Sequence, residues 1–343
     1  MTITNLLLLP LLSLLLPFCL SAPHNTLGNL DFPDPSVTFD PLTRKFYAFA
    51  TESHFTHVQV ASSPSFGSPP GSSASSSAGS WTYLPIDLLP TPGAWVNQSH
   101  PQIWAPDIHF LPSSQSWVMY YSALLASSPY HCIGTAISSS SSILGPYIAH
   151  SEPFACPSSQ GGAIDASGLF DNSTGTPKRF VIYKVDGSAK GPGGPCGNGF
   201  EPGFPTPFLL QEVDPHDGFT KIGEPTEVLD RLPGVDGPLI EAPRGGASGT
   251  RGKYVLFYSS HCFNTPGYDI KYAVAENITG PYERKGQLMG GESESFGFRA
   301  PGGASAVLRD KKMMLVFHAD CAAGRCMYET EWRVVNGSVV IVA

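Results

Sequence analysis

The fold is decided by the stretch Trp104-Ala105-Pro106-Asp107-Ile108 and by Trp117-Val118-Met119-Tyr120-Tyr121, which follows it after a polar turn. An acid among apolar residues, a turn, and then a run of aromatic and β-branched residues is typical of two adjacent strands. The chain repeats this pattern five times. The anchoring residues are Asp34, Asp107, Asp165, Glu241 and Ser305. The period is too long for hairpins and suits four-stranded units, so the sequence predicts an all-β fold, a five-bladed β-propeller.

A second repeat supports this prediction. Leu144-Gly145-Pro146-Tyr147 and Thr279-Gly280-Pro281-Tyr282 follow Asp107 and Glu241 at matching distances, as equal places in two blades would. The chain also contains 36 Gly and 33 Pro, which separate its short apolar runs as turns separate strands. In a propeller the innermost strands converge on a central channel, so we expect the anchoring acids to meet there.

The start of the chain predicts export. Residues 1–21 contain no charged residue and a leucine-rich run that is too short and too rich in proline to span a membrane as a helix. We predict a signal peptide over 1–21 and one propeller domain over 22–343 that is secreted into the extracellular space. The Ser/Gly/Pro-rich segment 62–80 is predicted to be a loop insertion in the first blade.

Cysteines and sequons agree with an oxidising compartment. Cys19 lies in the predicted signal peptide, and the even number of six cysteines that remain favours disulfides. We predict the pairs Cys132–Cys156, Cys196–Cys262 and Cys321–Cys326. Four N-x-S/T sequons indicate a glycoprotein, and they begin at Asn97, Asn172, Asn277 and Asn336.

Charge and motifs exclude several classes of protein. The net charge is −8 and there is no Lys/Arg cluster, which argues against nucleic acid or an anionic membrane as partner, and we expect a monomer. The histidines lack H-E-x-x-H spacing, so a catalytic zinc site is not expected. Gly-x-Ser-x-Gly and phosphate-binding glycine motifs are also absent from the sequence, so we expect no cofactor.

Three acids in apolar strands suggest carboxylate chemistry. Asp34 lies between two prolines, which restrict its backbone, while Asp107 and Glu241 are flanked by apolar residues and proline. Burying such acids is unfavourable unless they are paired or functional. Glycoside hydrolysis needs one protonated and one ionised carboxyl group, and a third carboxylate nearby would raise the pKa of the acid. For each residue alone, a turn cap at the end of a strand is the competing interpretation.

The sequence resembles glycoside hydrolase family 43 over nearly its whole length after residue 21. The motifs that carry the resemblance are Phe32-Pro33-Asp34-Pro35-Ser36-Val37, Trp104 to Ile108, Ile164-Asp165-Ala166, the strand that follows Glu241, and the two Gly-Pro-Tyr repeats. The resemblance implies a five-bladed propeller that hydrolyses arabinose- or xylose-containing polysaccharides with inversion. It also implies that Asp34 is the general base, Glu241 the general acid, and Asp107 the residue that orients the acid and tunes its pKa.

The resemblance suggests further site residues and one departure. Asp165, Arg299 and Lys184 are predicted to contact substrate, with structural or surface roles as the alternatives. Family members commonly carry Gly-His-x-Ser on the fifth inner strand, where the histidine helps to hold a metal ion or water. This chain has Gly302-Gly303-Ala304-Ser305, so we expect that the channel lacks this imidazole and binds no metal.

We therefore predict a secreted inverting glycoside hydrolase that acts on plant cell-wall polysaccharide or oligosaccharide, and favour α-L-arabinofuranosyl linkages. One alternative is a β-xylosidase. The other is a catalytically inactive propeller that binds glycans through the same pocket. The sequence does not separate exo from endo action.

Overall fold

The structure, a computed structural model, describes residues 24–53, 55–66, 81–173, 175–192, 196–199, 203–250, 253–290, 295–309, 312–335 and 337–342. The predicted signal peptide and residues 67–80 of the predicted insertion lie outside these ranges. The insertion begins later than predicted, because Ser62 and Ser63 are buried as the last residues of a strand, Gln59–Ser63.

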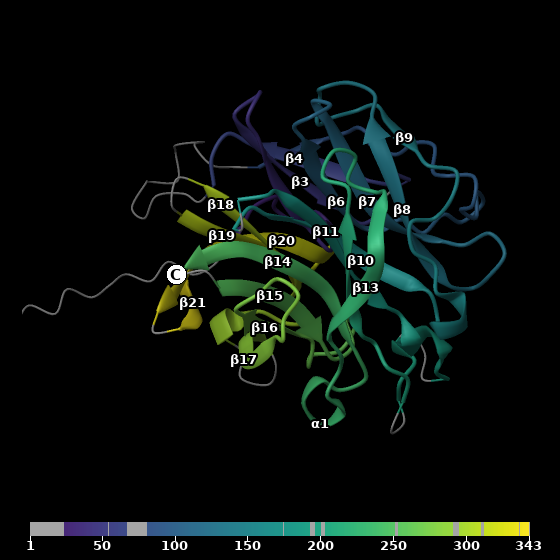
Figure 1. Cartoon of the computed structure of the whole chain (residues 1–343). Helices are drawn as coiled ribbons and strands as arrows, with labels where there is room; N and C mark the ends of the chain where they lie inside the picture. The colour runs from purple at the N-terminus through teal and green to yellow at the C-terminus, as the bar shows by residue number, and fades with distance from the viewer. Residues whose placement is uncertain are drawn as a thin grey trace, which may run out of the picture.

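The described strands form five antiparallel sheets, called blades 1 to 5 (Figure 1). Blade 1 contains β2 (Ser36–Asp40), β3 (Lys45–Ala50), β4 (Gln59–Ser63) and β5 (Thr82–Leu84). Blade 2 contains β6 (Trp104–Leu111), β7 (Ser116–Leu124), β8 (His131–Ser138) and β9 (Tyr147–Ala149). Blade 3 contains β10 (Ala163–Asp171), β11 (Lys178–Val185), β12 (Phe208–Val213) and β13 (Lys221–Leu229). Blade 4 contains β14 (Ile240–Thr250), β15 (Lys253–Ser260), β16 (Asp269–Ala275) and β17 (Glu283–Gly290). Blade 5 contains β18 (Gly302–Arg309), β19 (Lys312–Cys321), β20 (Gly324–Val335), β21 (Ser338–Val342) and β1 (His24–Asn25). Short helical turns occur in the connections: η1 (Ser158–Gln160), η2 (Gly187–Lys190), α1 (Pro233–Asp236) and η5 (Ser295–Gly297).

The blades close into a ring. The first strands of the five sheets, β2, β6, β10, β14 and β18, contact one another in this order, and β18 contacts β2. The short strand β1 from the start of the described chain pairs with β20 in the last blade, with His24 opposite Glu329. This pairing ties the two ends of the described chain into one sheet. The predicted five-bladed β-propeller is confirmed.

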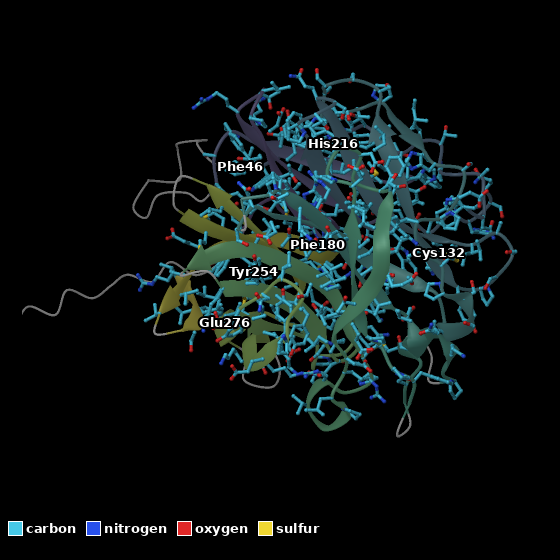
Figure 2. All side chains as sticks on the ribbon, in the orientation of Figure 1. Phe46, Cys132, Phe180, His216, Tyr254 and Glu276 are labelled. Carbon is cyan, nitrogen blue, oxygen red and sulfur yellow. A yellow bond between two sulfur atoms is a disulfide. The ribbon has the colours of Figure 1, made fainter. Side chains whose placement is uncertain are left out.

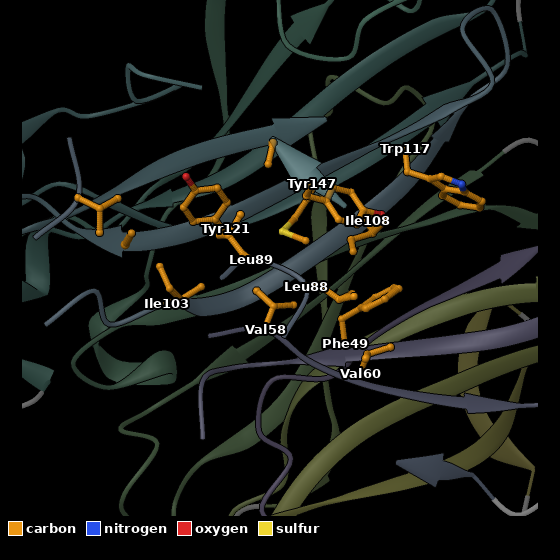
Figure 3. Packing of buried hydrophobic residues seen from close by; sticks show 14 of the residues in the cluster. Phe49, Val58, Val60, Leu88, Leu89, Ile103, Ile108, Trp117, Tyr121 and Tyr147 are labelled. Atoms are coloured by element: carbon orange, nitrogen blue, oxygen red, sulfur yellow. The ribbon is translucent and has the colours of Figure 1, made fainter. Parts of the chain in front are cut away.

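The hydrophobic core lies between neighbouring blades. Five clusters of buried side chains in the described residues each join one pair of adjacent blades around the ring. Figure 3 shows the cluster between blades 1 and 2, where Phe49 and Val60 face Ile108 and Trp117. The alternation of side chains along the strands therefore supplies two apolar faces to each sheet. This packing is the source of the rigid frame that holds the inner strands.

Three disulfides are present, and the predicted pairs are confirmed. Cys132–Cys156 joins β8 to the segment before blade 3, and Cys321–Cys326 spans the turn between β19 and β20. Cys196–Cys262 links the connections of blades 3 and 4. Cys132 is labelled at the right of Figure 2. The same view labels Phe180 and Tyr254, which belong to the cluster between blades 3 and 4. In the described residues no helix is long and apolar enough to cross a membrane.

Candidate active site

A left-handed residue lies in the inner strand of blades 2 to 5 and just before the inner strand of blade 1. A residue with left-handed backbone occurs there in each blade, namely Asp34 (φ 53°), Ala105 (φ 43°), Asp165 (φ 60°), Ala242 (φ 51°) and Gly303 (φ 60°). In blades 2 to 5 the register with the second strand shifts across this residue. Such a β-bulge bends the strand and redirects its side chains. The four bulges and Asp34, which precedes the first inner strand, lie together around one cavity.

A cavity of ≈ 510 Å³ lies at the bulges, and all five blades contribute to its wall. The charged side chains in the wall are Asp34, Asp165, Asp186, Glu241, Lys184 and Arg325. Four carboxyl groups thus share a concave space with only two basic groups. Concave sites with convergent titratable groups are the usual location of catalysis in enzymes.

Asp34 is held as a carboxylate. Thr51 donates its hydroxyl hydrogen to Oδ2 at 2.6 Å, and the guanidinium of Arg325 lies 3.1 Å from Oδ1. Burial by itself raises the pKa of Asp34, but the Arg325 cation and the Thr51 hydrogen bond outweigh burial, and the pKa lies below its ordinary value. Asp34 is therefore ionised at neutral pH and can accept a proton from water.

Glu241 has the opposite electrostatics. Tyr268 donates to Oε1 at 2.8 Å, and the ammonium of Lys184 lies 3.4 Å from Oε2. Burial raises the pKa of Glu241 more than these two contacts lower it, and the negative charges of Asp186 and Asp34 add to the rise. Lys184 is itself shared with Asp186 at 3.0 Å, so it does not neutralise Glu241 alone. Glu241 can thus retain a proton and donate it.

Asp165 is a close companion of Glu241. Its Oδ2 accepts a hydrogen bond at 2.8 Å from the backbone N–H of Ala242, the residue after Glu241. Burial raises the pKa of Asp165, and repulsion from Glu241 raises it further. The two carboxyl groups therefore compete for ionisation, since two like charges in one buried site disfavour each other. Asp165, for which the sequence predicts a substrate contact or a turn cap, is fixed against the backbone next to Glu241.

Asp107 does not reach the cavity, and its predicted position beside Glu241 is corrected. It lies two residues past the bulge of blade 2, where its carboxylate contacts His109 at 2.7 Å, Arg244 at 3.0 Å and the N–H of Gly168 at 3.0 Å. Burial raises the pKa of Asp107, but His109 and Arg244 outweigh it and lower the pKa well below the ordinary range. Asp107, Arg244 and His109, called the ion-pair layer below, form a neutralised cluster in the ring of inner strands.

The reason for this error is the register of the bulges. The repeat treats the anchoring acids as equivalent, but the structure aligns Asp34 and Asp165 at the bulge itself, Glu241 one residue earlier and Asp107 two residues later. The sequence contains a signal for this alignment. Pro35, Pro106 and Pro243 each follow the left-handed residue directly, so aligning the prolines places Ala105, not Asp107, opposite Asp34.

The predicted substrate-binding residues separate in the structure. Lys184 lines the cavity but is buried between Asp186 and Glu241. Arg299 does not line the cavity: its side chain is 70% exposed and lies 3.3 Å from Asp320. The arginine of the cavity is Arg325, the second residue of β20, and it also lies over the ring of Phe263 at 5.4 Å. Arg325 lies outside the repeated motif of the inner strands, so the sequence pattern gives no signal that it enters the cavity.

The fifth inner strand has Gly303 where the resemblance leads one to look for a histidine, but an imidazole from the neighbouring strand lies beside this glycine. His318, from β19, is fully buried beside Gly303 and accepts a hydrogen bond on Nδ1 from the N–H of Asp34 at 2.9 Å. Its partner across the sheet is Gly302, so β19 delivers the ring to the bulge of blade 5. In the described residues no group of three His, Cys, Asp or Glu side chains is arranged to hold a metal ion. The histidine of the fifth blade thus comes from its second strand.

Aromatic rings complete the wall. Trp104 lines the cavity and stacks on His131, with ring centroids 3.7 Å apart and an interplanar angle of 21°. Burial lowers the pKa of His131 to about 4, so this ring is uncharged at neutral pH. Phe263 faces the cavity from blade 4. Flat apolar surfaces beside fixed polar groups are common in pockets that bind small polar molecules.

The fold and site define a propeller with a central pocket in which paired carboxyl groups have pKa values shifted in opposite directions. The sequence profile of Glycosyl hydrolases family 43 matches residues 23–335. The chain therefore belongs to family 43 of the glycosyl hydrolases, and the predicted family and enzyme class are confirmed at this level. No curated protein sequence matches the chain.

Solved structures with the same fold include a thermostable family-43 glycoside hydrolase (TM-score 0.74, 21% identity, 94% of this chain and 96% of that chain covered). An exo-1,5-alpha-L-arabinanase from a bovine ruminal metagenomic library matches with a TM-score of 0.63 and 19% identity, covering 93% of this chain and 97% of that chain. A xylan beta-1,4-xylosidase from Bacillus halodurans C-125 matches with a TM-score of 0.65 and 17% identity, covering 95% of this chain and 56% of that chain.

Proposed function

We propose that this protein is an inverting glycosidase in which Asp34 is the general base and Glu241 the general acid. The observation that carries the proposal is the opposite shift of their pKa values within one cavity, downward for Asp34 and upward for Glu241. Pairs of titratable groups whose surroundings push their pKa values apart are the usual mark of an acid and a base. Asp165, rather than Asp107, is the carboxyl group that forms a buried pair with Glu241 and competes with it for ionisation.

The placement of the two carboxyl groups supports inversion. Asp34 belongs to blade 1 and Glu241 to blade 4, and their inner strands are not neighbours in the ring. Both groups line the same cavity, and the proposal places a sugar and a water molecule between them, with the water on the face opposite the leaving group. Inverting glycosidases need a separation of about 6.5–9.5 Å between the carboxyl groups for this reason.

In the proposed reaction Glu241 donates its proton to the glycosidic oxygen while Asp34 removes a proton from water that attacks the anomeric carbon. The bond to the leaving oxygen breaks as the new C–O bond forms on the other face. Arg325 stabilises ionised Asp34, and its remaining N–H groups can donate to sugar hydroxyls. Burial and the negative charges of Asp186 and Asp34 favour protonated Glu241 before cleavage, and repulsion within the buried pair of Asp165 and Glu241 means that ionisation of one disfavours ionisation of the other.

For the sugar we propose an α-L-arabinofuranosyl unit of plant polysaccharide, in line with the exo-arabinanase among the structural relatives. The xylosidase among them makes a β-xylosyl unit the second candidate. Initial rates on aryl arabinofuranoside, aryl xyloside, and linear and branched arabinan decide between the two. Proton NMR of the first product should show the opposite anomer to the substrate. Retention at early times would overturn the inverting mechanism, and no hydrolysis of any substrate would leave only glycan binding.

We also propose that the protein is exported. The support is chemical: three disulfides in the described residues fit an oxidising compartment. Expression with the native leader should place disulfide-bonded, active protein in the culture medium. Retention of all protein inside the cells would contradict this proposal.

A further inference from the structure

The backbone of Asp34 has one fixed partner. Because Pro33 and Pro35 carry no N–H, the N–H of Asp34 is the single backbone donor of the segment Pro33–Pro35. It donates to Nδ1 of His318 at 2.9 Å. The two residues are far apart in the sequence and meet because blade 5 packs against blade 1. The same residue has a φ of 53°, which residues other than glycine rarely adopt. The position of Asp34 thus depends on an imidazole in the second strand of another blade.

The imidazole is in the form that can accept this bond. Burial and the Arg325 cation lower the pKa of His318 to about 3, so the ring is neutral when the enzyme works near neutral pH. Since Nδ1 accepts from Asp34, the ring proton resides on Nε2. Nε2 is buried without a hydrogen-bond partner in the described residues. The contact with Asp34 is therefore the polar interaction that orients the ring.

Gly303 makes the space for this arrangement. A Cβ atom at Gly303 would lie 2.9 Å from Nδ1 and 3.0 Å from Cε1 of His318. A side chain at position 303 and the imidazole in its observed place exclude each other. The observed position of the His318 ring therefore requires a glycine at position 303.

The imidazole of His318 packs on Tyr268, the residue that donates a hydrogen bond to Glu241. The rings of His318 and Tyr268 are stacked, with centroids 5.9 Å apart and an interplanar angle of 8°. The hydroxyl of Tyr268 donates to Oε1 of Glu241 at 2.8 Å. One buried ring therefore contacts the backbone of Asp34 and packs on the side chain that holds Glu241.

We propose that His318 is a positioning residue for hydrolysis, and that it sets the location of the Asp34 carboxylate relative to Glu241 through the bond from the Asp34 N–H to Nδ1. The inference rests on the proposed function. Its consequence is kinetic, because a displacement of about 1 Å in a reacting group can lower the rate about 100-fold without loss of binding. His318 acts on kcat more than on KM.

Two amide substitutions test this directly. In His318→Asn the side-chain oxygen can occupy the place of Nδ1 and accept from Asp34, whereas in His318→Gln the amide occupies the place of Nε2. We expect His318→Gln to lower kcat about 30- to 100-fold on an aryl glycoside, with little change in KM, and His318→Asn to lower it less than about 10-fold. Gln is closer to His in volume, so a role in packing alone predicts the opposite order.

Gly303→Ala is a second, independent variant. It should displace the imidazole and lower kcat by a factor similar to that of His318→Gln. Gly28→Ala is the matched control, because Gly28 has a φ of 64° and a Cβ added there would meet no atom within 4 Å. This control introduces the same backbone strain without touching the site, and its kcat should equal that of the wild type.

The outcomes separate the two levels of the proposal. If the wild type hydrolyses glycosides and His318→Gln retains more activity than His318→Asn, the positioning role through Nδ1 is overturned. If every variant changes only the melting temperature, His318 is structural. If the wild type and all variants fail on every glycoside, the proposed function fails and not the inference alone.

Discussion

The cavity and the ion-pair layer are two buried clusters of charge a few residues apart on the same inner strands. In the layer, Asp107 is surrounded by Arg244, His109 and a backbone N–H, and its pKa is low. In the cavity, Asp165 and Glu241 share one lysine with Asp186, and both of their pKa values are raised. A neighbouring cation stabilises a buried carboxylate and lowers its pKa. Burial and like charges without enough cations raise the pKa, so the group keeps a proton that it can donate.

We therefore expect the ion-pair layer to stabilise the fold and the carboxyl groups of the cavity to carry the chemistry. Removing a partner from the matched layer leaves a buried arginine uncompensated, which is destabilising. Removing a carboxylate from the cavity relieves repulsion. The variants below are ordered from the largest expected effect to the smallest.

The largest effect is expected for the two reacting groups. Glu241→Gln removes the proton that the leaving oxygen needs, and Asp34→Asn removes the base, so each should lower kcat by roughly 1,000-fold or more. Steady-state rates on an aryl glycoside and on a polysaccharide measure this. The matched control is Glu276→Gln, whose carboxylate is 70% exposed in a pair with Lys253 and should not affect the rate. Near wild-type turnover in Glu241→Gln would refute the assignment.

A smaller effect is expected when the cation beside Asp34 is removed. Arg325→Met leaves Asp34 buried without its counter-charge, so the pKa of Asp34 should rise. Because the base acts when ionised, activity is lost as pH falls through this pKa, and the acidic limb of kcat/KM should move to higher pH. Arg299→Met is the control, since this exposed arginine lies away from the cavity. An unchanged acidic limb in Arg325→Met would show that Arg325 does not set the charge of Asp34.

The smallest effect is expected from metal removal. Gly303 offers no side-chain ligand, and Nδ1 of His318 is already bonded to Asp34. Activity should therefore be the same before and after dialysis against EDTA, and elemental analysis should find no stoichiometric calcium. A loss that calcium restores would place a cation at the Nε2 side of His318.

The sequence predicts the fold of this protein better than its site. Apolar strands repeat with their turns, so the blades can be read from Trp117–Tyr121 and its counterparts, and the cysteine pairs follow from proximity in the chain and between blades. The side chains that enter the cavity depend on the bulge, and a shift of one residue reverses the facing of a strand. Asp165 lies at the bulge of its strand, whereas Asp107 lies two residues past the bulge of its own, and this offset places the two acids in different clusters.

Other site residues have no local signal. Arg325 and His318 lie on the third and second strands of blade 5, outside the repeated motif, and reach Asp34 only because the ring closes blade 5 against blade 1. Arg299 is adjacent in sequence to the fifth inner strand, yet its side chain extends toward Asp320. Tertiary closure, which no local pattern encodes, decides which of these arginines faces the cavity.

The most direct test of the two-cluster assignment compares Asp165→Asn with Asp107→Asn in kcat, pH profile and free energy of unfolding. Asp165→Asn should lower kcat about 100-fold, move the alkaline limb to lower pH because the pKa of Glu241 falls, and leave stability unchanged or higher at neutral pH. The sign follows from its raised pKa: an ionised Asp165 opposes folding above that pKa. Asp107→Asn should lower the free energy of unfolding by about 3 kcal/mol, while the folded enzyme keeps its alkaline limb. The reverse pattern, with a stable but inactive Asp107→Asn and an active Asp165→Asn, would contradict the assignment.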